Sequence, residues 1–507
     1  MHTVYKKVSL VLLLVYAIML IPFTNAEAST PEKIKIGLYY GSGANDSYTI
    51  SSQDGITISL ANDQNSSAIF TDSKISSMTV KKNTYFSTEY AGLFPDSDSA
   101  FAKVEDLRAQ GYDAYCSVKG GIYSVRIGLY ATFEEAQASA PNLGTYAVQF
   151  TSTGVLFLSG EDVIIAVDGV DSFPEVAPIS GNISINSVAY RGSLRFLRSS
   201  GNDMAAINVL PLEEYLYSVV PKEVSASWNE EVLKAQAVAA RTFTITSLNK
   251  FAKYGFNLDN TTASQVYGGV DAEHPRTTAA VDATKGEIVL YNGAPASIYY
   301  HASSGGRTAN SEDVWSSALP YLRSVEDPYE NPKEATHGKW EISYTKEELK
   351  SALAQRGVNI GDIVDVVTEY SDGHATKLTF VGTNGSKSYT KDNIRVPLSL
   401  KSTNFTLTKS GKLPEKSILS KVFPSARAGK SLASIGKNTA NHSKALANSF
   451  GSSEIFSGSA KDYTFTGGGW GHGVGMSQWG AKGMADNGFT YKEILTHYFT
   501  GVQVETY

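Results

Sequence analysis

The sequence predicts an α+β protein, in which a β-rich domain with one packed helix follows a small ferredoxin-like module. Most of the chain consists of short runs that alternate apolar and polar residues between Gly, Asn, Asp and Ser turns, which is typical of half-buried strands. Residues 83–142 instead follow a helix–strand–strand–helix order, and residues 232–248 form one long alanine-rich helical segment. A chain of 507 residues has room for two or three such domains.

Composition and charge restrict the functional classes. The net charge of -6 argues against a nucleic-acid-binding surface, which would need an excess of Lys and Arg. The 29 tyrosines suit contacts with sugars, because each ring is apolar and its tip is polar; a β-rich exported protein explains them equally well. Cys116 is the only cysteine, which rules out an intramolecular disulfide and a cysteine-based zinc cluster. We expect it to be a buried apolar residue.

Residues 1–28 have the pattern of an export signal. Lys6 and Lys7 precede a long apolar run, and Ala26 and Ala28 have the A-x-A spacing of a cleavage site. Cleavage would release an extracellular or cell-wall protein. An uncleaved segment would anchor the protein to the outer face of the cytoplasmic membrane, and it is the only membrane contact that we predict.

Residues 30–80 alternate as strands and contain no group of acids and bases. We expect a small β region there and assign no role to it.

Residues 81–145 form the second predicted unit. Ala100, Val104 and Leu107 share one face of a helix that ends at Gly111. The Lys-Gly-Gly sequence at 119–121 predicts a hairpin.

A second helix in this unit begins at Thr132, where Glu135 completes a capping box. The stretch "YSVRIGLYATFEEAQA" resembles a SPOR domain, a fold that binds peptidoglycan strands stripped of their stem peptides, whereas the first strand, around "NTYFSTEY", matches poorly. A generic ferredoxin-like βαββαβ module is the alternative.

The segment 210–251 carries the most distinctive sequence. Ser227 and Glu230 predict a capping box for the long helix. Glu223 precedes this helix, on a linker between two helical stretches, and its neighbours Val219, Val220 and Val224 favour a raised carboxyl pKa. Lys222 and Lys234 would oppose that shift, and a solvated or capping role for Glu223 is the alternative reading.

Five ordered motifs between residues 180 and 507 resemble the SpoIID/LytB family. They are "EEYLYSVVPKEVSASWNEEVLKAQAVAARTF", "SQVYGG", "TKGEIVLYNGAPASIYYHASSGGRTANSEDVW", "YLRSVEDPYE" and "GGGWGHGVGMSQWGAKGMADNGFTYKEILTHYFTGV". One departure is clear, because Val-Ser-Ala at 224–226 stands where Met-Pro is usual.

The resemblance implies peptidoglycan as the substrate class and no cofactor. SpoIID-type members are lytic transglycosylases of denuded glycan strands, and LytB-type members are described as enhancers of a wall amidase, which would then be a partner. Glu223 matches the family's catalytic glutamate, and Glu213 and Glu214 are fallback candidates. A lytic transglycosylase needs one carboxyl that first donates and then accepts a proton, unlike the carboxylate pair of ordinary glycosidases.

The remaining site candidates are residues that we expect to contact substrate. His301 ends a predicted strand beside a Ser-Ser-Gly-Gly turn, and the glycine-rich stretch at 466–488 places tryptophan rings beside a bare backbone that suits a saccharide groove. A structural histidine and a buried turn are the respective alternatives. The full set is Lys234, Gln236, Arg241, Tyr267, His301, Ser304, Trp470, His472, Ser477 and Gln478.

We expect no metal site. Some family members hold zinc near the "SQVYGG" motif through Cys and His, but residues 260–269 contain neither, and the eight histidines are scattered.

Residues 409–460 interrupt the family pattern. This insertion is rich in Ser, Ala, Gly and Lys and has a local net charge of +6. It is either a solvated linker or a segment that contacts anionic wall polymers.

Overall fold

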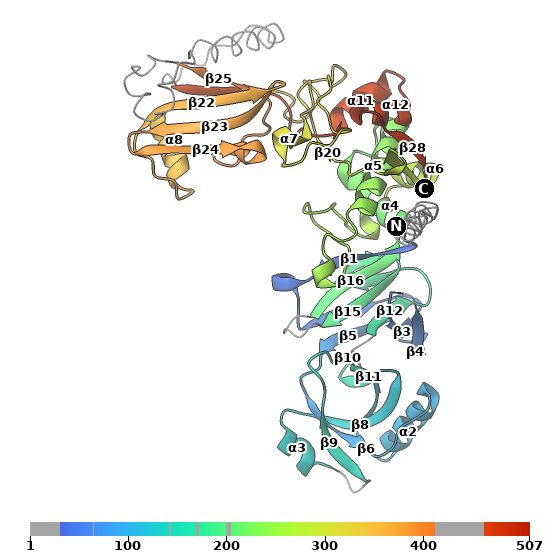
Figure 1. Ribbon diagram of the computed structural model, residues 1–507. Coiled ribbons are helices and arrows are strands. Elements are labelled where there is room, and N and C mark those ends of the chain that lie inside the picture. The colour runs from blue at the N-terminus through green and yellow to red at the C-terminus, as the bar shows by residue number, and fades with distance from the viewer. Residues whose placement is uncertain (1–30, 64, 141–142, 169–171, 199–203, 411–460) are drawn as a thin grey trace, which may run out of the picture.

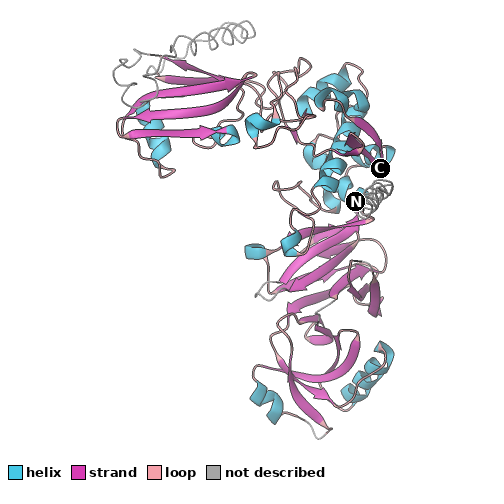
Figure 2. Ribbon diagram, viewed as in Figure 1, coloured by secondary structure: helices cyan, strands magenta, loops and turns pink. Residues whose placement is uncertain are grey.

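The computed structural model describes residues 31–63, 65–140, 143–168, 172–198, 204–410 and 461–507. The predicted export signal and nearly all of the basic insertion lie outside the described residues. The fold is strand-rich and mixes helices with sheets, so the α+β prediction is confirmed. Two arms meet at a helical corner, and each arm is built mainly of strands (Figure 1, Figure 2).

A seven-stranded sheet adjoins the helical corner. In spatial order its strands are β17 (Leu258–Asp259), β1 (Lys33–Tyr39), β16 (Met204–Pro211), β15 (Ser193–Arg198), β12 (Phe173–Pro178), β3 (Ile56–Ala61) and β4 (Ser66–Asp72). Alternation places Ile34 and Ile36 of β1 in the core while Lys33 and Lys35 face outward.

A ten-stranded sheet follows along the same arm. It begins with β14 (Val188–Tyr190), β13 (Ile183–Ile185), β2 (Ser47–Ser51), β5 (Ser77–Lys82), β10 (Val155–Ser159) and β11 (Asp162–Asp168). The strands of residues 30–80 are therefore shared between two sheets and pair with strands from 155–211. They do not form a separate β region, because their edges are completed by distant segments.

The same sheet continues into the ferredoxin-like unit at the tip of this arm. Its elements are β6 (Phe86–Tyr90), α2 (Ser97–Ala109), β7 (Ala114–Lys119), β8 (Ile122–Tyr130), α3 (Phe133–Ala138) and β9 (Thr145–Gln149). The strand order β7-β8-β6-β9 includes the first strand, although its sequence matches the SPOR pattern poorly. Thr132 and Glu135 form the predicted capping box, and Cys116 is buried as expected.

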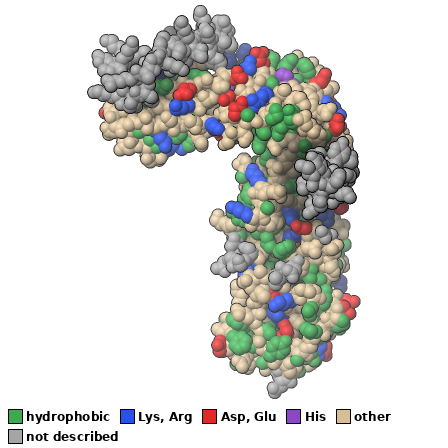
Figure 3. Space-filling view, viewed as in Figure 1, with side chains coloured by type: hydrophobic (Ala, Val, Ile, Leu, Met, Phe, Trp, Pro, Cys, Tyr) green, Lys and Arg blue, Asp and Glu red, His purple; other side chains and the backbone are tan. Residues whose placement is uncertain are grey.

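Apolar side chains gather on the surface of this tip (Figure 3). Those of Leu93, Ile122, Phe133 and Tyr146 are exposed. These four residues come from different segments of the unit, and each adds exposed apolar area to its surface.

The helical corner contains the residues predicted to carry the chemistry. Its helices are α4 (Leu212–Glu223), α5 (Glu230–Thr246), α6 (Pro275–Ala283), α7 (Ser311–Val314), α11 (Gln478–Asp486) and α12 (Tyr491–Tyr498). A small sheet of β19 (Ala294–Pro295), β18 (Glu287–Tyr291) and β28 (Gln503–Thr506) packs against them. The alanines of α5 are buried and allow this close packing.

Two local predictions in this region are wrong. The N-cap of α5 is Asn229, whose side chain accepts a hydrogen bond from the Glu231 amide, while the Ser227 hydroxyl pairs with that of Ser225. Glu223 is the last residue of α4 rather than part of a linker.

The second arm begins with the sheet β21 (Trp340–Tyr344), β26 (Tyr463–Gly467) and β25 (Phe405–Lys409). A second sheet of β22 (Ile363–Ser371), β23 (His374–Gly382) and β24 (Gly385–Thr390) lies with α8 (Lys346–Ala354) beside it. Leu349, Phe380, Phe405 and Phe465 form part of the shared core. In the described part of the chain no helix has the length and apolar character needed to cross a membrane.

Candidate active site

Glu223 and the C-terminal glycine-rich motif meet at one point, although 255 residues separate them in sequence. Glu223 ends α4 and Gln478 begins α11. The Gln478 side-chain amide donates to the Glu223 carboxylate at 3.3 Å and lies 3.4 Å from the side-chain oxygen of Gln236 on α5. Gln478 therefore contacts two other predicted site residues, and the three come from three different helices.

A buried hydrogen-bond network supports the carboxyl from the other side. Tyr300, at the start of β20 (Tyr300–His301), hydrogen-bonds Glu223. Gln265 donates to the Tyr300 hydroxyl at 2.9 Å and accepts from Tyr215 at 3.2 Å and from Thr244 at 2.9 Å. Sequence reasoning missed these residues, although Gln265 and Tyr300 lie within motifs that it singled out.

The environment of Glu223 favours its protonated form. Val219, Val220 and Val224 are buried around it, and burial raises the pKa of the Glu223 carboxyl. Hydrogen bonds from Gln478 and Tyr300 to the ionised form oppose this rise without cancelling it. Lys234 was expected to oppose this rise in the pKa of Glu223. It instead forms ion pairs with Glu230 at 2.6 Å and with Glu231 at 3.1 Å.

The glycine-rich backbone is explained by close packing between two turns. β20 pairs in parallel with β27 (Met476–Ser477), and Ser303 bridges to Trp470. Gly305 has φ of +68°, and a Cβ there would lie 2.3 Å from the carbonyl carbon of Gly468. The Trp470 side chain stays 43% exposed beside His337, so it remains available to a ligand.

Replacement of Gly305 tests this packing. Gly305→Ala is expected to lower the free energy of unfolding by about 1–3 kcal/mol or more, because it combines a left-handed backbone with a clash. Chemical denaturation would measure the change. Gly293→Ala is the matched control, since Gly293 also has positive φ but open space around it. Equal effects of the two variants would contradict the close approach.

The predicted substrate residues Ser304 and Ser477 are buried and face a carboxylate pair instead of solvent. Glu330 accepts from Ser303 at 2.5 Å, from the Ser304 amide at 2.8 Å and from Ser477 at 3.1 Å. Asp327 accepts from Ser304 at 2.7 Å. Burial raises the pKa of both carboxyls. The carboxyls of Asp327 and Glu330 therefore hold the residues that follow β20 against Ser477 of β27. Sequence reasoning missed this cluster.

The two predicted histidines lie next to each other. His301 is buried, its Nδ1 lies 3.2 Å from the carbonyl oxygen of Val474, and its Nε2 has no partner among the described residues. The His472 ring lies 5.5 Å from the His301 ring, and its Nδ1 accepts from the Val474 amide at 3.1 Å. Burial lowers the pKa of His472 to about 4 and that of His301 well below its ordinary value. Both rings are therefore neutral at neutral pH.

Two of the predicted substrate residues have roles inside the protein. Arg241 is fully buried and pairs with Glu213 through hydrogen bonds of 2.6 and 2.8 Å. Tyr267 is buried and donates to Asn208 at 2.8 Å. Neither side chain has a surface to offer a glycan, and we leave both out of the substrate site. The same ion pair makes Glu213 a structural residue rather than a fallback acid.

Over the residues that the structure describes, no group of three or more His, Cys, Asp or Glu side chains is arranged to hold a metal ion. At Glu223 the structure shows one carboxyl with an amide donor from Gln478 and a hydroxyl donor from Tyr300.

Two regions of the chain match known protein families, and several known proteins are similar to it. Residues 90–150 match the SPOR domain, and residues 200–291 match the SpoIID family, described as "Stage II sporulation protein". An uncharacterized protein of Brachyspira hyodysenteriae (strain ATCC 49526 / WA1) is 32% identical over 372 residues, which cover 71% of this chain and 87% of that protein.

Two relatives have descriptive names. The "Amidase enhancer" of Bacillus subtilis (strain 168) is 30% identical over 89% of this chain, and the match covers 59% of that protein. "Stage II sporulation protein D" of the same strain is 29% identical over 59% of this chain and 76% of its own length.

The fold, the two matched regions and the site together define a protein of cell-wall remodelling. The chain belongs to the SpoIID family and carries a SPOR domain, which confirms both resemblances seen in the sequence.

Proposed function

We propose that this protein is a lytic transglycosylase that cleaves the bond between N-acetylmuramic acid and N-acetylglucosamine in denuded glycan strands, with Glu223 as the acid and base. The observation that carries the proposal is the partly buried Glu223 carboxyl, whose pKa is raised by burial while Gln478 and Tyr300 hydrogen-bond it. A carboxyl that is neutral in its resting state yet stabilised once ionised suits both halves of the reaction.

The reaction balances with this one carboxyl. Protonated Glu223 donates its proton to the glycosidic oxygen, and the bond from that oxygen to C1 of the muramic acid breaks. The C6 hydroxyl of the same sugar then bonds to C1 and gives its proton to the Glu223 carboxylate, which leaves a 1,6-anhydro end. Gln478 and Tyr300 stabilise the carboxylate between the two transfers.

Glycan binding would use the first arm and the helical corner. The SPOR domain would hold denuded strands at the tip of the first arm. Two tryptophans of the glycine-rich motif would offer faces on which sugars stack. Trp479 is half-buried, follows Gln478 directly and has its ring 4.8 Å from that of Trp228, and Trp470 is exposed beside Ser303 and His337. We retain Gln236, His301, His472 and Gln478 as residues that shape this site, and Lys234 at its margin. The protein would act outside the cytoplasm, on the cell wall.

A second candidate function is non-catalytic enhancement of a wall amidase, which would then be a partner. It is favoured by the relative named for that role, whose match spans 89% of this chain, and by Val-Ser-Ala at 224–226 in place of Met-Pro. Val224 is buried and caps α4, so this departure lies directly beside the proposed acid.

Mass spectrometry of denuded glycan after incubation with the full chain separates the two candidates. A transglycosylase releases fragments with 1,6-anhydromuramic ends, which are lighter by one water than hydrolysis products. Absence of such ends, together with faster stem-peptide release when an amidase is added, would support the enhancer.

The rate of anhydro-end release should depend on pH through the ionisation of the Glu223 carboxyl. Because burial raises the pKa of Glu223, its protonated form persists to higher pH than in an ordinary glutamate, and it is lost as pH rises through that raised value. The rate of anhydro-end release should therefore fall with rising pH, while glycan binding, measured by pull-down, stays constant. A rate that rises steadily with pH would contradict the assignment of Glu223 as the initial acid.

A further inference from the structure

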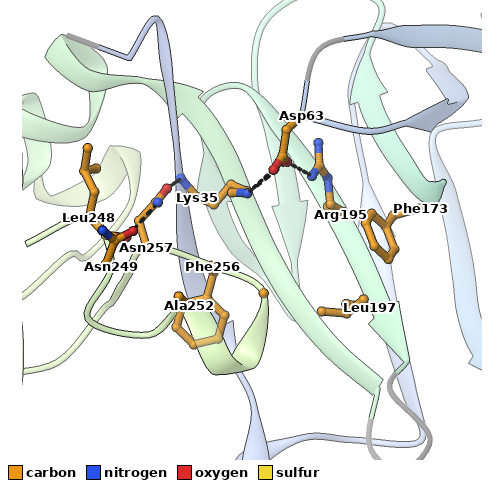
Figure 4. A pocket seen from close by; sticks show the side chains of 11 residues that line it. Lys35, Asp63, Phe173, Arg195, Leu197, Leu248, Asn249, Ala252, Phe256 and Asn257 are labelled. Carbon is orange, nitrogen blue, oxygen red and sulfur yellow. Dashed lines mark hydrogen bonds and ion pairs between the residues drawn. The ribbon is translucent and has the colours of Figure 1, made fainter. Parts of the chain in front are cut away.

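A cavity of about 480 Å³ lies away from Glu223, on the outer side of the seven-stranded sheet (Figure 4). Strands β1, β12 and β15 form one wall, and the loop at 248–257 that follows α5 forms the other. Its volume falls within the range of small-molecule sites. Gln236 precedes the end of α5 by ten residues, which is roughly 15 Å of helix rise, so this cavity is distinct from the candidate active site.

One side of the cavity is apolar and stiff. Phe173, Leu197 and Phe256 line it. The Phe256 ring is almost fully buried and lies nearly parallel to those of Phe251 and Tyr254, at centroid distances of 5.4 and 6.0 Å and an interplanar angle of 17° in both cases. Phe251 and Tyr254 are themselves 6.3 Å apart, so the three rings form a packed cluster that holds this wall in place, and a ligand that binds against the wall costs little ordering. The half-buried Phe173 and Leu197 provide its accessible apolar surface.

The other side is polar and its charges balance. The Lys35 ammonium donates to both Asp63 oxygens at 2.8 and 3.0 Å. Arg195 donates to Asp63 at 3.1 Å and to Glu175 at 3.0 Å. The Asp63 side chain is 68% exposed, and the exposed Asn249 lies at the rim. This side therefore offers donors and acceptors without a net charge.

We propose that this cavity is a second binding site for an uncharged saccharide unit such as an N-acetylated hexose. The apolar face of the sugar ring would lie on Phe173 and Leu197, and its hydroxyl and amide groups would exchange hydrogen bonds with Asp63, Lys35 and Asn249. An anionic ligand is disfavoured because Asp63 and Glu175 together already neutralise Lys35 and Arg195. The site depends on these residues alone and not on cleavage at Glu223.

Hydrogen-exchange mass spectrometry of the full chain tests the proposal, with an N-acetylglucosamine disaccharide as the probe. Amides in 248–257 should exchange about threefold more slowly with the disaccharide, because the ligand closes the loop against the sheet. Ala252→Trp places an indole at the exposed rim of the cavity and should abolish this protection. Ala354→Trp, at an exposed alanine that ends α8, is the matched control and should retain it.

Three outcomes would overturn the proposal. The first is the absence of protection at 248–257 in the unmodified chain, and the second is protection that survives Ala252→Trp. The third is protection by a sugar-free stem peptide but not by the disaccharide, which would assign the cavity to peptides. The release of anhydro ends tests the Glu223 site, whereas hydrogen exchange at 248–257 tests the cavity. The two proposals can therefore fail independently of each other.

Discussion

Glu223→Gln is expected to reduce the release of anhydromuramic ends by roughly 10²–10⁴-fold, the usual contribution of a general acid–base group. The amide keeps the shape of the side chain and its place beside Gln478 and Tyr300, but it has no proton of suitable acidity to give to the glycosidic oxygen. Quantified anhydro ends from purified denuded glycan measure the loss. Binding of glycan should persist, because most contacts lie on other residues.

The matched control for this variant is Glu214→Gln, on the same helix. Glu214 is only half-buried, and it was a fallback candidate for the acid. Full activity of Glu214→Gln together with loss in Glu223→Gln assigns the acid. Undiminished activity in Glu223→Gln would remove the proposed mechanism, and no anhydro ends from the unmodified protein would favour the amidase-enhancer role.

Arg241→Ala is expected to lower the stability of the helical corner by about 3–5 kcal/mol, because it leaves a partner of a buried ion pair uncompensated. Arg241 is fully buried, and its guanidinium joins Glu213 on α4 to the carbonyl oxygens of Glu287 and Val281. The variant therefore loses the ion pair, one hydrogen bond from α5 to β18 and one hydrogen bond from α5 to α6. Urea dependence of amide exchange in α5 measures this unit by itself.

The double variant Arg241→Met with Glu213→Met controls for burial of an unpaired charge. It should recover much of the lost stability, since an apolar pair of similar volume often replaces a buried ion pair without cost. If Arg241→Ala instead left stability unchanged and weakened glycan binding, the arginine would be a substrate residue after all.

The sequence predicted best those features that depend on neighbouring residues. Thr132 and Glu135 are three positions apart, so their capping box could be identified from the chain alone. The prediction of 30–80 as a small β region of its own did not anticipate its long-range pairing: β1, β2 and β3 also pair with strands more than a hundred residues further along the chain. The cap of α5 was misplaced by two residues, since several polar residues before the helix were suitable.

The candidate site shows the same division between features that local sequence reveals and features that depend on distant partners. Motif resemblance brought Glu223 and Gln478 forward, and the structure places them in contact. Residue type alone assigned Arg241 and Ser304 to substrate, yet each satisfies a buried carboxylate. Whether a polar side chain faces a ligand or an internal partner depends on tertiary packing, which local pattern does not encode.

The pairing of β25 with β26 has a practical consequence. Lys409 and Tyr463 lie opposite each other in the ladder, so the sheet itself clamps the two ends of the segment between them. A fluorescent reporter or affinity handle joined at these two positions would therefore have both of its ends anchored on one sheet of the second arm, away from the glutamate-bearing corner.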